Sequence, residues 1–344
     1  MDFGIFLLMQ SPAARPSAEI YGRAIEIAQA AEELGFSKLW VAEHHFLNYS
    51  YSSRPLLLLS HLAARTHRIR LGPAIVPLSL HHPLIVAEEL AAIDLLSGGR
   101  LEIGIGRGYQ KYQFERLGID MESAPQRYTE ALDILGLALN QQEFSYEGKC
   151  YRIPPTTIFP RPLQQPIPLW IVVNTTRRET VEEAIHHGAN MFTGGLEPIS
   201  RLVNIRTAYP DLFTDTSNIR VGTQRQVFVT DSAAEAERVA EEARWHARVS
   251  RSLRLNAEQV TRGVVQVQPL PEEPDTDLIL DEFVIAGTPD RCASQIRRIE
   301  RGLGADYFNC SVGIGDLPQA AILRSMERFA REVMPRFARA GHDA

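Results

Sequence analysis

Short apolar segments alternate with longer amphipathic segments along almost the whole chain. Eight short runs rich in β-branched and aromatic residues are predicted to be strands, at 3–8, 38–41, 69–76, 101–105, 169–173, 190–193, 220–229 and 307–312. Apolar residues recur at helical spacing between and after these runs, at 18–34, 55–64, 83–95, 126–140, 179–187, 199–209, 233–249, 289–301 and 319–337. This alternation predicts a parallel sheet with helices on its outside.

The number of strand and helix pairs favours a closed barrel. We predict an α/β fold of the (β/α)8 TIM-barrel type, with an open doubly wound sheet as the structural alternative. Such barrels often run to about 250 residues or more, so residues 1–344 are expected to form one domain.

Two insertions interrupt the repeat of strands and helices. Residues 143–168 are predicted to be a hairpin with an extended connection, and residues 251–280 a long structureless segment, a candidate mobile lid.

Composition and charge exclude several classes of partner. Hydrophobic residues make up 44% of the chain, and 36 basic against 42 acidic residues give a formal net charge of −6. The charges are mixed, so we expect neither nucleic acid nor a membrane as partner, and the Arg-rich segment 244–254 is interpreted as a solvated helix face. Three widely spaced cysteines indicate neither a disulfide framework nor a zinc site, which favours the cytoplasm.

A carboxylate and two histidines, Glu43, His44 and His45, directly follow the second predicted strand. In a barrel this position is the C-terminal rim, where active sites lie. The three residues could bind a metal, act in acid–base catalysis, or only form hydrogen bonds within the loop. His81 and His82 could complete a metal site in space. No metal-ligand motif accompanies them, however, so no metal is expected.

The fourth predicted strand ends in Gly106-Arg107-Gly108-Tyr109. Exposed backbone N–H groups beside a guanidinium suit a phosphate, although a tight connection is the plain alternative. The segment is not a dinucleotide fingerprint, because Tyr109 stands where that motif needs glycine, and no GK[ST] follows it.

A second turn suited to an anion follows the fifth predicted strand. Asn174, Thr175 and Thr180 lie where this strand gives way to a helix, with Arg177 and Arg178 between them. Free helix N-terminal amides favour an anion there, whereas an ordinary N-cap is the alternative. Two such turns at the ends of neighbouring strands could share one ligand.

Several separate segments together resemble the bacterial luciferase-like flavin monooxygenases, and most closely the luciferase catalytic subunit. The segments that carry this resemblance are 3–8, Gly35-Phe36 with Trp40, 43–46, His82-Pro83, 97–109, Thr288-Pro289 and Val333-Met334-Pro335.

The resemblance implies a two-component, FMN-dependent monooxygenase that acts on a hydrophobic organic substrate. A separate flavin reductase would supply reduced FMN, and O2 would convert it to a flavin C4a-peroxide. The resemblance also implies a homodimer and a mobile lid after the seventh strand. The alternatives are a deazaflavin-dependent hydride-transfer oxidoreductase, a non-catalytic flavin-binding protein and a metal-dependent hydrolase on the same scaffold.

The resemblance also implies roles for individual residues. His44 matches the catalytic histidine, which Glu43 and His45 would support. The expected cofactor-binding residues are Ala74 and Ile75, joined by a cis peptide beneath the flavin, and Gly106, Arg107, Gly108, Arg127, Asn174, Thr175 and Thr180. Two departures, Gly106 in place of a reactive cysteine and Asn174 in place of a glutamate, mean that light emission is not expected to carry over.

Overall fold

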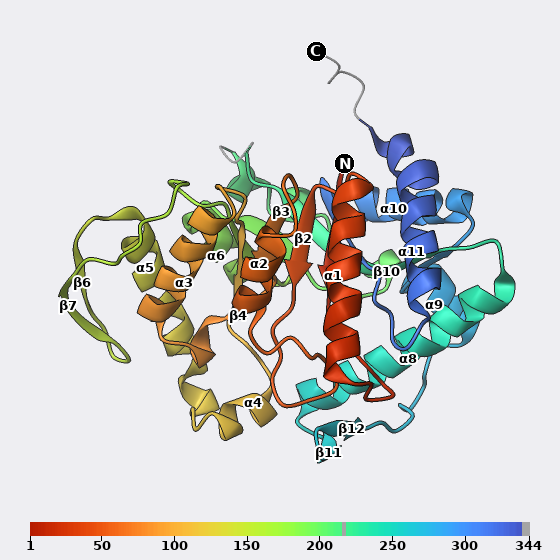
Figure 1. Ribbon diagram of the computed structural model, residues 1–344, viewed down its shortest axis with the longest axis horizontal. Coiled ribbons are helices and arrows are strands. Elements are labelled where there is room, and N and C mark those ends of the chain that lie inside the picture. The colour runs from red at the N-terminus through yellow and green to blue at the C-terminus, as the bar shows by residue number, and fades with distance from the viewer. Residues whose placement is uncertain (215–217, 339–344) are drawn as a thin grey trace.

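A ring of parallel strands forms the centre of the protein in this computed structural model, which describes residues 1–214 and 218–338 (Figure 1). The described strands of this barrel are β1 (Asp2–Leu7), β2 (Lys38–Val41), β3 (Arg70–Pro73), β4 (Val76–Pro77), β5 (Ile103–Gly106), β8 (Leu169–Val173), β9 (Asn190–Thr193), β10 (Val221–Val229) and β14 (Tyr307–Ser311). They pair in the order β3-β2-β1-β14-β10-β9-β8-β5-β4, and all of these pairs are parallel. The predicted α/β barrel is therefore confirmed.

The third predicted strand is present as two pieces. β3 and β4 are separated by Ala74 and Ile75, whose peptide bond is cis, as the resemblance implied. Leu71 of β3 bridges Leu101, and β4 pairs with β5, so the two pieces together bring the ring almost to closure.

Helices cover the outside of the barrel. They are α1 (Ser17–Glu33), α2 (Pro55–Ala63), α3 (Pro83–Leu96), α5 (Ala124–Asn140), α6 (Arg178–His186), α8 (Ala233–Leu255), α10 (Pro289–Leu303) and α11 (Gln319–Arg328). The local sequence explains where several of these helices begin or end. Proline stands in the first turn of α2, α3, α5 and α10, where its missing N–H costs nothing. The Thr288 side chain caps α10, and Gly304 ends it at φ +70°.

Two helix predictions were wrong in extent. Residues 199–209 form a 3₁₀ turn and then only the short α7 (Ile205–Ala208), because the Asn204 side chain caps a new start and Pro210 follows. The last predicted helix, 319–337, leaves α-helical geometry after Arg328. It continues as a π turn (Phe329–Val333) and a 3₁₀ turn (Met334–Phe337).

The first insertion contains the predicted hairpin, β6 (Phe144–Glu147) and β7 (Arg152–Thr156). The Glu130 carboxylate of α5 accepts hydrogen bonds from the backbone N–H groups of Lys149, Cys150 and Tyr151 at 2.8–3.0 Å. Because this carboxylate satisfies three donors of the turn at once, it fastens the hairpin to the barrel.

The second insertion is more ordered than its composition suggests, so the expectation of a structureless segment was wrong. α8 continues through it to Leu255, a hairpin of β11 (Gln259–Thr261) and β12 (Val264–Gln266) follows, and α9 (Thr276–Glu282) ends it. The Arg-rich face prediction was also partly wrong, because Val249 and Leu253 of α8 are fully buried. Two further short elements were not predicted, α4 (Lys111–Arg116) and β13 (Ile285–Gly287), which pairs with β10.

A polar network closes the barrel interior near the starts of the strands. The buried Glu102 carboxylate accepts hydrogen bonds from Lys38 Nζ, from Arg70 Nε at 2.6 Å and from Trp170 Nε1 at 2.6 Å. Above it, Trp170 stacks on Phe192 at 4.5 Å between ring centroids. This floor leaves only the other end of the barrel for a ligand.

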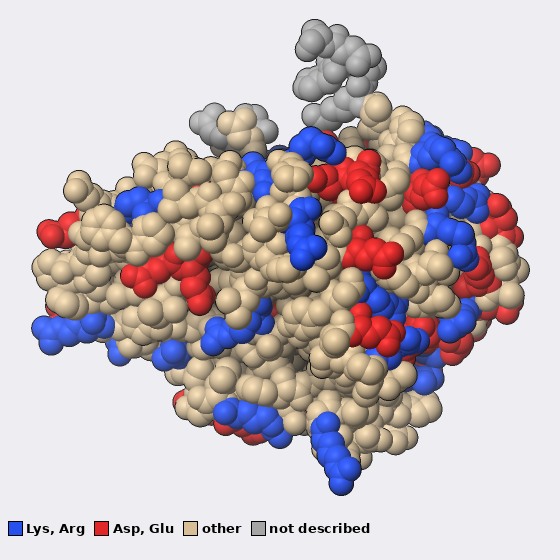
Figure 2. All heavy atoms as spheres, viewed as in Figure 1, with Lys and Arg blue, Asp and Glu red and all other residues tan. Residues whose placement is uncertain are grey.

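Figure 2 shows acidic and basic side chains interspersed over one face of the molecule. Within residues 1–214 and 218–338, no helix is long and apolar enough to cross a membrane.

Candidate active site

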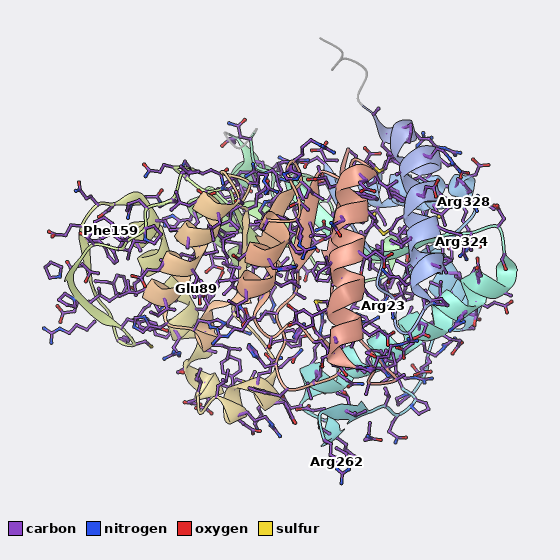
Figure 3. All side chains as sticks on the ribbon, in the orientation of Figure 1. Arg23, Glu89, Phe159, Arg262, Arg324 and Arg328 are labelled. Atoms are coloured by element: carbon purple, nitrogen blue, oxygen red, sulfur yellow. The ribbon has the colours of Figure 1, made fainter. Side chains whose placement is uncertain are left out.

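The strands all end on one side of the barrel, which we call the rim. Figure 1 shows α4, part of α8 and the β11–β12 hairpin gathered on this side, at the bottom of the view. The hairpin packs into the rim, because Val265 of β12 belongs to a buried cluster with Phe6, Leu8 and Tyr49. Figure 3 shows Arg262, at the hairpin tip, pointing away from the barrel.

The inner wall of the barrel is open just above the floor. Val172 of β8 follows Trp170 on the inward side of the strand, yet it is 44% exposed. A Cβ on the neighbouring Gly106 would lie 3.2 Å from the Ile75 side chain and 3.8 Å from Val172. Glycine at this position therefore leaves an apolar wall, formed by Ile75, Gly106 and Val172, uncovered at the rim.

Glu43 lies between two histidines. Its Oε1 is 2.9 Å from His45 Nε2 and 2.5 Å from His81 Nε2, and the three groups lie within 4.8 Å of one another. Two ligands of a tetrahedral zinc ion, each at about 2.0–2.1 Å, would lie about 3.3 Å apart, which is farther than either contact. We therefore interpret the cluster as a hydrogen-bonded carboxylate. Burial would raise the pKa of Glu43, but the two imidazoles outweigh it and lower that pKa.

His44 points away from this cluster and toward α4. Its Nδ1 is 3.1 Å from the Gln110 amide nitrogen and 3.4 Å from that of Gln113, and its ring meets the edge of Tyr49 at 4.8 Å. Burial lowers the pKa of His44 to about 3, and the charge of nearby Glu43 only partly opposes this. His44 is consequently neutral at physiological pH.

α8 supplies a second histidine, which the sequence did not indicate. His246 also contacts Tyr49, stacking on it at 5.5 Å between ring centroids, and its Nδ1 is 3.1 Å from Gln10 Oε1. Burial, and then the charge of Arg254, lower the pKa of His246 to about 4. The three aromatic rings of His44, Tyr49 and His246 thus form a continuous row across the rim. No local motif could have revealed it, since its members lie about 200 residues apart in the chain.

The two turns expected to bind phosphate do lie together. β5 and β8 are paired with Ile105 opposite Ile171, so Arg107 is level with Val173 and next to Asn174. Arg107 and Asn174 are exposed and Thr175 is half-buried, which leaves their polar groups accessible. Gly108 adopts φ +85°, a conformation that favours glycine and turns the chain into α4.

Two other predicted phosphate ligands already have partners. The Thr180 hydroxyl accepts a hydrogen bond from the Asn174 N–H at 3.0 Å and donates to the Arg177 carbonyl at 2.8 Å. Arg127 Nε donates to the Ser79 carbonyl at 3.0 Å. In this arrangement both residues shape their loops, and their direct contact with a phosphate stays a prediction.

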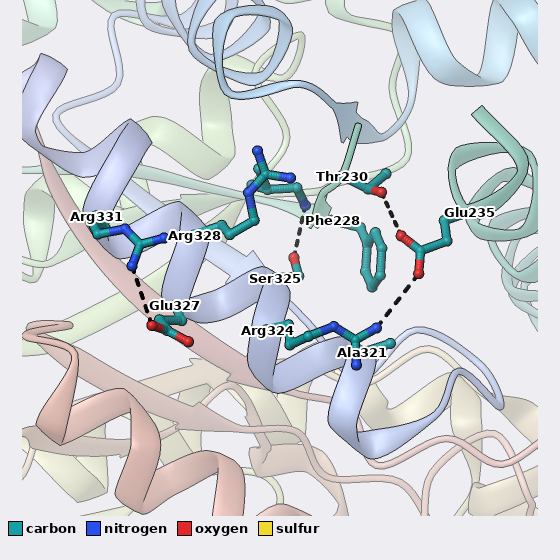
Figure 4. Close-up of a pocket in the computed structure, with 10 residues that line it drawn as sticks. Phe228, Thr230, Glu235, Ala321, Arg324, Ser325, Glu327, Arg328 and Arg331 are labelled. Atoms are coloured by element: carbon teal, nitrogen blue, oxygen red, sulfur yellow. Dashed lines mark hydrogen bonds and ion pairs between the residues drawn. The ribbon is translucent and has the colours of Figure 1, made fainter. Parts of the chain in front are cut away.

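A hollow of about 270 Å³ lies away from the rim, between β10 and α11 (Figure 4). Its charged side chains pair with one another. Arg324 lies 3.7 Å from Glu235, and Arg331 lies 3.5 Å from Glu327. It shares no residue with the rim groups described above, so we assign it no part in the chemistry.

A family described as luciferase-like monooxygenases matches residues 1–307. The chain belongs to this family. An uncharacterized protein of Sinorhizobium fredii is 33% identical over 97% of each chain. The oxygenase component of a flavin-dependent trigonelline monooxygenase from Acinetobacter baylyi is 27% identical, over 98% of this chain and 96% of its own. Membership confirms the predicted enzyme class, a flavin-dependent monooxygenase.

Several solved structures share the fold. The monooxygenase RslO1 of Streptomyces bottropensis superposes with a TM-score of 0.86 at 24% identity, covering 98% of this chain and 100% of its own. The oxygenating constituent of a Pseudomonas putida 3,6-diketocamphane monooxygenase, in complex with FMN, gives 0.80 at 18% identity over 98% and 99%. A coenzyme F420-dependent reductase of Methanopyrus kandleri gives 0.68 at 22% over 98% and 99%.

Proposed function

We propose that the protein is the cytoplasmic oxygenase of a two-component system that uses reduced FMN and O2 to oxygenate a hydrophobic organic molecule. The observation that carries this proposal is the arrangement at the rim. An apolar wall, a cation beside a polar turn, and a half-buried neutral histidine all lie at the same open end of the barrel. Two relatives named as oxygenating parts of larger systems support it. The described cysteines are all unpaired, as a reducing compartment would have them.

The residues of the rim fit a flavin mononucleotide. Arg107, Asn174 and Thr175 would hold its phosphate, because an exposed guanidinium lies beside a polar turn there. Asn174 Oδ1 already accepts from Thr176, so this residue would use its NH2 group. Ile75 and Val172 would contact its ring system, since the missing side chain of Gly106 leaves their surface open. When bound, the reduced flavin supplies the electrons that activate O2.

The remaining rim residues would control water and protons. Val249, Leu253 and Val265 bring an apolar cover from α8 and β12 over Phe6. Such a cover excludes water from a reactive oxygen species. His44 would place a hydrogen-bonding group beside the reacting oxygen, and the hydrophobic lining would favour an apolar substrate.

We further propose a homodimer and a flavin reductase as partner. α2 and α3 expose large apolar side chains, of which Leu57 is 72%, Ile85 54% and Leu96 67% exposed. Phe159, 75% exposed, projects from the same side of the molecule in Figure 3. Apolar residues gathered in this way are typical of an interface. Light scattering during gel filtration should give twice the chain mass, and Leu57→Glu with Ile85→Glu should give the monomer.

The test is anaerobic mixing of the protein with reduced FMN, followed by rapid exposure to O2 while the flavin spectrum is recorded. We expect a spectrum that differs from both oxidised and reduced FMN and that outlasts the reoxidation of free flavin. Reoxidation at the rate of free FMN, together with tight binding of reduced F420, would instead establish hydride transfer with a deazaflavin.

A matched pair of variants tests the phosphate site separately. Arg107→Met should weaken FMN binding but leave riboflavin binding unchanged, because riboflavin lacks the phosphate. Arg116→Met removes a cation from α4, where the guanidinium lies 3.1 Å from the Tyr112 ring centroid, and should change neither. Equal weakening by both variants would contradict the placement of the phosphate.

A further inference from the structure

A pair of glutamines holds His44 from the side of α4. Gln110 and Gln113 are only 2% and 4% exposed, and they follow the Gly108 turn at the end of β5. The Gln113 amide donates to Gln110 Oε1, and the Gln110 amide nitrogen lies 3.1 Å from His44 Nδ1 and 3.3 Å from the Tyr109 hydroxyl. Gln110 is therefore fixed at both ends of its amide.

This arrangement determines which nitrogen of His44 carries the proton. Because Gln110 Oε1 accepts from Gln113, its NH2 group must face His44. Gln113 presents a second NH2 group to the same ring nitrogen at 3.4 Å. An imidazole nitrogen that faces two donors acts as the acceptor, so the single proton of the neutral ring lies on Nε2.

The second histidine of the row has the opposite arrangement. Gln10 presents its amide oxygen, not its nitrogen, to His246 Nδ1 at 3.1 Å. That nitrogen must then carry the proton. The two imidazoles that contact Tyr49 thus differ in tautomer, because His44 faces the NH2 end of a glutamine amide and His246 faces the oxygen end of another.

We propose that Gln110 is a positioning residue that keeps His44 in the Nε2–H tautomer, so that His44 meets the reacting oxygen as a hydrogen-bond donor rather than as a base. The tautomer follows from the contacts alone, whereas the role toward oxygen rests on the proposed function. With Nδ1 occupied and Nε2 protonated, His44 accepts a proton only by breaking the bond to Gln110. A neutral donor of this kind stabilises an oxygen that gains negative charge.

Charged and titratable groups around His44 come from several elements. Glu43 and His45 adjoin it in the loop after β2, His246 and Arg254 approach from α8, and Tyr109 precedes α4. Glu43 directs its carboxylate to His45 and His81 rather than to His44. The hydrogen bond at Nδ1 therefore comes from the glutamines and not from an acid.

Solid-state NMR of sedimented protein labelled with ¹⁵N-histidine reports the tautomer directly. The His44 signals are identified among the ten histidines by their loss in His44→Asn. We expect an unprotonated Nδ1 and a protonated Nε2 for His44, and the reverse for His246. A protonated Nδ1 on His44 in the natural protein would overturn the proposal without any variant.

Three variants test the part played by Gln110. Gln110→Glu places an acceptor at Nδ1 and should convert His44 to an Nδ1–H or doubly protonated ring. Gln110→Met removes the nearer donor and leaves only the Gln113 amide at 3.4 Å, so it should give a mixture of tautomers. Gln10→Glu adds the same charge at the rim but keeps an acceptor at His246, so the His44 signals should not change. Unchanged His44 signals in both Gln110 variants would refute the positioning role.

Kinetics separate this proposal from the proposed function. If both hold, Gln110→Glu should lower the yield of oxygenated product per reduced FMN by roughly 100-fold, as loss of one oriented donor does elsewhere. FMN binding should change little, because the Gln110 amide is engaged by His44, Tyr109 and Gln113. If the natural protein shows the predicted tautomers but does not oxygenate anything with reduced FMN, the positioning role stands and the proposed function fails.

Discussion

Asn48 fastens the β11–β12 hairpin over the rim, and its removal should loosen this hairpin. Its side-chain Oδ1 accepts from the Val265 N–H at 2.9 Å, and its Nδ2 donates to the Ser11 carbonyl at 3.1 Å. Asn48 is 3% exposed, so Asn48→Ala would leave the Val265 N–H without this partner, whereas the Ser11 carbonyl keeps its bond from the Ala14 N–H at 3.0 Å. Its own N–H bond to the Gly263 carbonyl, at 2.8 Å, persists in the variant.

The size of the effect follows from the bond to Val265. A buried group that loses its partner costs about 1–3 kcal/mol, so closure of the hairpin should weaken by about that amount. At about 1.4 kcal/mol per tenfold, the open state becomes roughly 5- to 150-fold more populated. More water at the rim should then increase the fraction of reduced flavin whose oxidation yields only hydrogen peroxide.

Hydrogen exchange measured by mass spectrometry reports the opening directly. Peptides that cover residues 259–266 should exchange faster in Asn48→Ala, whereas peptides from α1 should not change. Asn140→Ala is the control, because it removes another asparagine bond, from Nδ2 to the Gly136 carbonyl at 2.9 Å, far from the lid. Equal exchange of the hairpin in both variants would refute the assignment of Asn48 as the fastening.

Three further results are expected. Glu102→Gln deprives Lys38 and Arg70 of their buried carboxylate and should lower the free energy of unfolding by about 3–5 kcal/mol, measured by urea denaturation. A loss below about 1 kcal/mol would contradict the stabilising role of Glu102 in the floor of the barrel. His44→Ala should lower oxygenated product by about 10²–10⁴ while reduced FMN is still oxidised, and full activity would exclude a catalytic role. Because His44 and His246 titrate near 3 and 4 when folded but near 6.5 when unfolded, the unfolded chain binds more protons between these values. Stability should therefore fall as the pH drops from about 6.5 toward 4, by up to about 1.4 kcal/mol per unit for each histidine, and His246→Gln should remove one such contribution.

The barrel was predictable because short, largely apolar strands alternate with amphipathic helices along the chain. The segment Leu169–Val173, for example, lies between neighbouring strands inside and helices outside, and no other role suits five such residues. β13 was not predicted from the sequence, because it has only three residues and these make no periodic pattern. Among the described strands it pairs only with β10. The second insertion, residues 251–280, was wrongly predicted to be structureless because its prolines and acidic residues give no strand pattern. Its hairpin depends instead on a hydrogen bond to Asn48, more than 200 residues earlier in the chain.

Some residues of the candidate site could likewise be predicted from the sequence, and others could not. Glu43, His44 and Arg107 were found because each directly follows a strand, and strand ends in a barrel meet at one rim. Gln10, Gln110 and His246 carry no such signal, since polar residues in loops and on helix faces are usually solvated. Their importance depends on which atom of each side chain faces which partner, and only the folded chain determines that.

The floor and the rim of this barrel are built to different requirements. Glu102 is surrounded by donors from three strands, so any change there leaves a buried charge unpaired. The rim is built from loops, α8 and a hairpin, whose side chains contact one another mainly through apolar packing and single hydrogen bonds. Changes at Val249, Leu253 or Val265 therefore cost only the packing of one side chain. Substitutions at the rim can thus change which substrate fits, whereas the floor, and with it the depth of the site, tolerates little change.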